Sequence, residues 1–111
     1  METNNKSVVK FDFQHGFAND TIILKVNSKE VFKKDDLSSD LRISLAGSFT
    51  IDVLNGQTRL EIIVPTKNLS ISKTIMIDSE EGKYIGISII NPETKNPQLK
   101  ITELNEQPFY L

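Results

Sequence analysis

One histidine and several aspartates are the side chains of this sequence that could carry out chemistry. His15 stands next to Gly16, with Asp12 and Asp20 nearby, so a carboxylate could orient the imidazole as a general base. No serine occurs in a pattern such as Gly-x-Ser-x-Gly, which would present a nucleophile to that base. We therefore interpret His15 as a loop histidine beside a turn glycine, and we expect that the protein is not an enzyme.

A second group of oxygen-bearing side chains lies between residues 35 and 40. Asp35, Asp36 and Asp40 are carboxylates, and the two serines between them add hydroxyl oxygens. Such hard oxygen ligands suit calcium, but the spacing does not match an EF-hand loop and the glycine of its sharp turn is missing. The three aspartates are weak metal candidates in what we expect to be a solvated acidic loop, and we expect no cofactor.

The two arginines of the chain fall on either side of one aspartate in the strand pairing predicted below. Arg42, Asp52 and Arg59 would form a row on the outer face of a sheet. Guanidinium groups suit carboxylates and phosphates, so the row could bind an anion. Exposed pairs of this kind are common and weak, at roughly 0.2–1 kcal/mol each. We interpret the row as a structural ion row.

The last residues of the sequence are apolar, although chain ends are usually polar. Phe109, Tyr110 and Leu111 follow a proline and provide three large side chains in succession. They either fold back to close the end of the domain or anchor another subunit or protein. We expect this segment to be needed for stability or for self-association.

Length and composition limit the classes of function. The chain has 111 residues, no cysteine and a net charge of −2, which matches a single domain without disulfides or thiol chemistry. This charge gives no reason to expect a nucleic acid or an anionic membrane as partner. No signal peptide is visible, and no apolar run approaches the roughly 18 residues that span a bilayer. We expect a cytoplasmic protein that binds neither nucleic acid nor membrane.

The elements that position these side chains are predicted to be β-strands. From residue 41 to residue 64, apolar and polar residues alternate in three runs, and Asn55-Gly56 separates the last two. This period of two is typical of half-buried strands, and Asn-Gly is typical of a two-residue hairpin. We therefore predict a three-stranded antiparallel meander, in which Ile51 faces Leu60 and a three-residue loop pairs Leu45 with Phe49.

Similar patterns predict the remaining strands, at 8–13, 21–26, 29–33, 69–77, 84–90 and 99–103. Asn27-Ser28 is predicted to be a two-residue turn that pairs Leu24 with Val31, which would point Phe32 outward. Lys73 interrupts an otherwise apolar row. Residues 1–7 are predicted to be a disordered tail, and residues 34–40 a connection between sheets.

About eight short strands without a convincing helix favour an antiparallel β-sandwich, formed by one domain at 8–111. A small closed β-barrel is the alternative.

Two classes of function remain open. The first is a non-enzymatic protein-interaction or structural module, with a protein partner or self-association. Strands 21–26 and 84–90 favour it, because they carry aliphatic residues on both faces and need cover. The second is a small-ligand or carbohydrate-binding sandwich, in which calcium could take part. The absence of tryptophan disfavours a carbohydrate site, since such sites use aromatic platforms.

Overall fold

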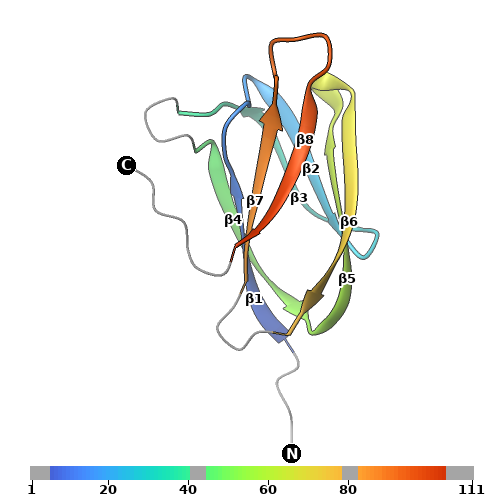
Figure 1. The fold of residues 1–111 in the computed structure, drawn as a ribbon. Helices are drawn as coiled ribbons and strands as arrows, with labels where there is room; N and C mark the ends of the chain where they lie inside the picture. The colour runs from blue at the N-terminus through green and yellow to red at the C-terminus, as the bar shows by residue number, and fades with distance from the viewer. Residues whose placement is uncertain (1–5, 41–44, 79–82, 105–111) are drawn as a thin grey trace, which may run out of the picture.

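The protein is a β-sandwich of two open sheets (Figure 1). The computed structural model describes residues 6–40, 45–78 and 83–104. Within these ranges, one four-stranded sheet has the order β4 (Gly47–Leu54), β1 (Lys6–Phe13), β7 (Lys83–Ile90) and β8 (Gln98–Leu104). The other has the order β3 (Lys29–Leu37), β2 (Asp20–Val26), β5 (Gly56–Val64) and β6 (Leu69–Ile77). A short 3-10 helix, η1 (Pro65–Lys67), joins β5 to β6. The predicted sandwich is confirmed, and the barrel alternative is wrong.

The first sheet is mixed rather than antiparallel throughout. β1 pairs with β4 in antiparallel orientation and with β7 in parallel orientation, from Val9 opposite Lys83 to Phe13 opposite Ile87. Parallel neighbours need a long connection, and here the whole second sheet lies between the two strands in the chain. β1 also begins at Lys6, so residues 6 and 7 belong to the sheet rather than to the predicted tail.

The predicted hairpin at Asn55-Gly56 is wrong, because β4 and β5 lie in different sheets. Ile51 pairs with Val9, whereas Leu60 pairs with Val26 on one side. The φ of Gly56 is 125°, far from the value of about 57° that a left-handed turn residue adopts. The chain therefore crosses between layers here. Alternation identified the buried face of each strand, but two apolar rows can be buried face to face as well as side by side.

The first part of the predicted meander is also wrong where the structure describes it. Leu45 pairs with Asp40 in an isolated bridge, rather than with Phe49. Phe49 lies opposite Phe11 of β1. Residues 41–44 lie outside the described residues.

A β-bulge turns Phe32 toward the core. The predicted loop at Asn27-Ser28 is confirmed, since Val26 pairs with Lys29 across it. The register then shifts, so that Leu24 pairs with Phe32 rather than with Val31. An extra residue on one strand reverses which side chains face inward beyond it. β3 also continues to Leu37, so residues 34–37 form part of a strand and not a connection.

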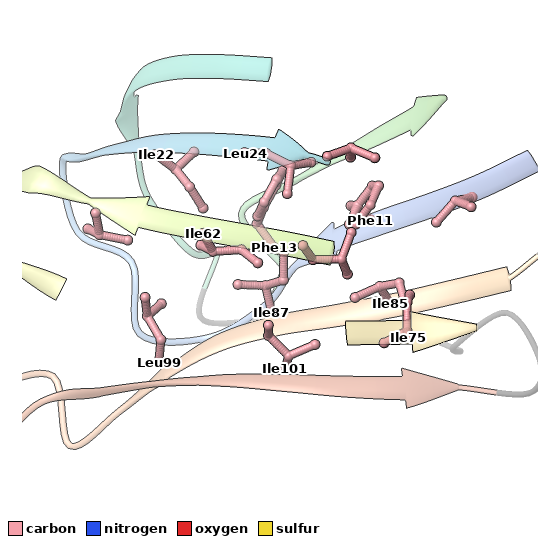
Figure 2. Close-up of a cluster of buried hydrophobic side chains, with 14 of the residues drawn as sticks. Phe11, Phe13, Ile22, Leu24, Ile62, Ile75, Ile85, Ile87, Leu99 and Ile101 are labelled. Atoms are coloured by element: carbon pink, nitrogen blue, oxygen red, sulfur yellow. The ribbon is translucent and has the colours of Figure 1, made fainter. Parts of the chain in front are cut away.

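The inner faces of both sheets supply one apolar core (Figure 2). Phe11 and Phe13 of β1 point toward Ile22 and Leu24 of β2, and all four side chains are fully buried. Phe13 also stacks on Phe32, with ring centroids 5.4 Å apart. No helix in the described parts of the chain is long and apolar enough to cross a membrane.

Candidate functional site

The residues that could form a general base with His15 are engaged elsewhere. Asp20 is buried and accepts hydrogen bonds from Lys67 Nζ at 2.5 Å and from the Thr66 hydroxyl at 2.6 Å. Asp12 accepts a hydrogen bond from the Ser48 hydroxyl at 2.7 Å. His15 itself is exposed, and its carbonyl accepts the Ile89 N–H. The structure does not bring these residues together as a catalytic pair.

The side chain of Asp20 connects the β1–β2 connection and η1 at one end of the sandwich. Burial raises the pKa of Asp20, but hydrogen bonds from Lys67, Thr66 and the Ala18 N–H together outweigh this effect and hold the pKa below its ordinary value. The carboxylate thereby links the β1–β2 connection to η1. This arrangement is structural, because each contact holds one segment of the chain to another.

A groove of about 490 Å³ lies at the same end, lined by His15, Phe17, Ser38, Ser39, Lys67 and Glu93 among others. Its polar groups also hold loops together. The Ser39 hydroxyl donates to the Gln14 carbonyl at 2.6 Å and accepts the Phe17 N–H at 3.1 Å. Ser38 accepts the Asn19 N–H at 2.8 Å. Both serines of the lining are thus engaged in contacts between loops.

The three aspartates named as weak metal candidates lie in different local settings. The Thr21 hydroxyl donates to Asp35 at 2.9 Å. Asp36 has a φ of 56° near the end of β3, and Asp40 forms the bridge with Leu45. Across the described residues, no group of three or more acidic or histidine side chains is placed to hold a metal ion.

The predicted ion row is not assembled by strand pairing. Asp52 lies on β4 opposite Val8, whereas Arg59 lies on β5 opposite Thr74, in the other sheet. Arg42 and the tail residues Phe109, Tyr110 and Leu111 lie outside the described residues, so their predicted roles stay predictions.

The edges of the two sheets differ in how they are protected against a further strand. An exposed edge strand can pair with another chain unless charges, bulges or inward-facing ions prevent it. β3 is protected by its register shifts and by a row of charged residues: Lys29, Glu30, Lys33, Lys34, Asp35 and Asp36. Its irregular backbone does not offer a regular ladder of hydrogen bonds.

β6 and β8 are protected by charges on their inner faces. Lys73 of β6 interrupts the apolar row, and its Nζ lies 3.5 Å from Glu103 Oε2 of β8. Lys83 Nζ lies 2.8 Å from the other carboxylate oxygen. The hydrogen bond from Lys83 lowers the pKa of Glu103 against the opposing effect of burial, and the charges of both lysines lower it further. This ion group closes the β6–β8 side of the sandwich.

β4 has neither kind of protection. Its eight residues pair with β1 without a register shift, from Gly47 opposite Phe13 to Leu54 opposite Lys6. Asp52 is its single charged residue, and the strand contains no proline. In the part of the chain that the structure describes, β4 pairs with β1 alone. Among the described residues, its other edge is therefore a regular strand edge without a neighbouring strand.

A groove with apolar and charged lining lies beside this edge. It has a volume of about 350 Å³ and is lined by Ile51, Asp52, Val53 and Leu54 of β4, by Val26, Asn27, Lys29 and Val31 of the β2–β3 hairpin, and by Lys6 of β1. A strand added to β4 would direct alternate side chains toward this groove, because successive side chains point to opposite faces. Sequence reasoning missed the site because the meander prediction placed β4 between two neighbours.

No protein-family model matches the chain, and no curated protein is similar to it.

Proposed function

We propose that the protein is a non-enzymatic interaction module that binds an extended polypeptide segment along β4. The observation that supports this is the difference between the edges: β4 is regular and nearly uncharged, whereas β3, β6 and β8 carry bulges or inward-facing ions. Addition of a strand to an exposed sheet edge is a common mode of peptide recognition.

The two parts of this site have separate tasks. The backbone of β4 provides hydrogen bonds to any extended segment, at about 0.5–1.5 kcal/mol each. The groove selects side chains, because Val26, Val31 and Val53 form the apolar part of a lining that also contains Lys6, Lys29 and Asp52. A partner segment should therefore have small or aliphatic side chains at every second position.

Binding of a generic strand tests this proposal. The probe is a capped octapeptide of alternating threonine and valine with a lysine at each end, added to dilute ¹⁵N-labelled protein. We expect amide shift changes confined to β4, β1 and the β2–β3 hairpin, with slower hydrogen exchange in β4. The same peptide with its central valine replaced by proline should have no effect, because proline lacks the N–H. Shift changes confined to β6 or β8, or none at millimolar peptide, would contradict the proposal.

A further inference from the structure

We infer that the strand that adds to β4 is β4 of a second copy of this chain, antiparallel and centred on Ile51. This inference rests on the proposed function, since it identifies the partner of the same edge. The two first sheets would then join into one continuous sheet across a two-fold axis, as in other isologous dimers.

The alternation of β4 restricts how two copies can pair. In an antiparallel pair, residues directly opposite each other point to the same face, so an inner residue must meet an inner residue. The inner residues of β4 are Phe49, Ile51 and Val53, whose side chains are buried or half-buried. The axis must therefore pass through a residue of β4 rather than between two residues.

Three centres are available near the middle of the strand. A centre at Thr50 would place Val53 opposite Gly47 of the other copy and leave a gap on the inner face. A centre at Asp52 would place two carboxylates opposite each other, which is unfavourable. A centre at Ile51 places Phe49 of each copy opposite Val53 of the other, and Ile51 opposite itself. Only this last register fills the inner row and separates the carboxylates.

The outer face supports the same register. With the centre at Ile51, Thr50 of each copy lies opposite Asp52 of the other, so a hydroxyl donor meets a carboxylate acceptor at two symmetric places. Asp52, the single charge of β4, then meets no like charge across the interface. Leu54, which is 61 % exposed, lies opposite Ser48 of the other copy and loses part of its contact with water.

The size of the contact predicts a weak dimer. One pair of eight-residue strands is a small interface compared with the roughly 1,600 Å² of a typical stable complex. Apolar contacts at the two grooves add to it, because the inner side chains of each copy extend toward the groove of the other. We expect a concentration-dependent dimer with a Kd on the order of micromolar.

A matched pair of variants tests the inference by sedimentation velocity over a concentration series of the full chain. Thr50→Glu places a new carboxylate opposite Asp52 of the other copy, twice in each dimer. The Kd should rise by about tenfold or more. Thr50 is exposed and lies opposite Lys10 within its own sheet, so the fold should be retained. The control is Thr74→Glu, an exposed threonine on the edge strand β6 opposite Arg59, which should leave the Kd unchanged.

A charge exchange tests the register. In the double variant Thr50→Glu with Asp52→Lys, each new carboxylate lies opposite a lysine of the other copy, so the Kd should return to within about threefold of the original value. A register centred on Thr50 would place the two new carboxylates opposite each other and would not be rescued. Failure of rescue, with both variants folded by circular dichroism, would contradict the Ile51-centred dimer.

Other outcomes separate the dimer from the proposed function. A chain that stays monomeric at every concentration but still binds the alternating octapeptide would overturn the dimer and leave strand addition at β4 intact. A dimer that is insensitive to Thr50→Glu, in a chain that does not bind the peptide, would overturn both. A dimer weakened by Thr74→Glu would place the contact at β6 and would also overturn the inference.

Discussion

The two open sides of this sandwich are closed in different ways. On the β6–β8 side, Lys73 and Glu103 point inward from facing edge strands and meet at 3.5 Å. On the β3–β4 side, the rings of Phe32 and Phe49 meet with centroids 4.6 Å apart, and a groove lies farther along β4. Ions on an inner face oppose the addition of a strand, whereas rings and a groove leave the backbone edge of β4 usable. Edge protection, rather than a pocket, distinguishes the side at which we propose that a partner binds.

The aromatic contact should contribute most to stability. Phe32→Ala removes a half-buried ring that packs against Phe13 and Phe49, and we expect the free energy of unfolding to fall by about 2–3 kcal/mol. Chemical denaturation would measure this change. Phe32→Leu, which keeps most of the apolar volume, should cost clearly less. Equal losses for the two variants would show that ring stacking does not close this side.

A lysine on the inner face of β4 should protect this edge against strand addition, as Lys73 protects β6. Ile51→Lys places on β4 the device that Lys73 provides on β6, and in the proposed dimer it brings two ammonium groups opposite each other. We expect the dimer to be lost in sedimentation experiments, with a cost to monomer stability of about 1 kcal/mol. The control is Ile71→Lys, which is also half-buried on the inner face of an edge strand. A similar loss of dimer in both variants would contradict the assignment of the contact to β4.

Replacement of Lys73 by an apolar residue should allow the edge strand β6 to pair with other chains. Lys73→Val continues the apolar row of β6 and leaves Glu103 with Lys83, so the free energy of unfolding should change by less than about 0.5 kcal/mol. Turbidity on heating or at high concentration should nevertheless increase, because an uncharged edge strand pairs with other chains. Lys33→Val on β3 is the control and should not increase turbidity, since the register shifts of β3 remain. Equal turbidity of Lys73→Val and the unchanged chain would contradict this role of Lys73.

The pH dependence of Glu103 should be the smallest effect. Its pKa is lowered in the folded state, so the stabilisation is present above the ordinary pKa of 4.5 and is lost as the pH falls through the lowered value. Because the pair is partly exposed, Glu103→Gln should reduce the acid-induced loss of unfolding free energy by well under 1 kcal/mol. Asp20→Asn should reduce it as well, since the pKa of this buried carboxylate is also lowered. Denaturation curves between pH 3 and about pH 7 would test both variants, and a variant that leaves the acid-induced loss unchanged would be contrary to the structure.

Local patterns in the sequence predicted most strands and their buried faces. The alternation around Ile51 and Leu60 was correct for each strand, and the turn at Asn27-Ser28 was placed correctly. The sheet to which each strand belongs could not be predicted. The same apolar row is buried whether the next strand of the chain pairs with it in one sheet or packs against it from the facing sheet. The bulge that turns Phe32 inward was likewise not predicted. The outward direction that the predicted register gave to this large apolar ring indicated that the register was wrong.

The candidate site was not predictable from sequence for the same reason. Whether β4 is an edge depends on its pairing with β1, which is distant in the chain, and not on the residues of β4 itself. Lys73 was noticed as an interruption, but its role is visible only with Glu103 opposite. By contrast, Asp35, Asp36 and Asp40 were singled out for their chemistry alone. In the structure Asp35 and Asp40 take part in separate local contacts, and Asp36 has a left-handed backbone conformation.

The parallel pairing of β1 with β7 has a consequence for how the protein folds. β1 is the first strand of the chain, yet it occupies the interior of its sheet and needs β7 from the last third of the sequence as a neighbour. Contacts between such distant segments slow folding, because a long stretch of chain must be ordered before they form. During synthesis, β1 therefore lacks one of its neighbours until β7 has been made, and we expect chains truncated at Ile77 to be targets of chaperones and proteases.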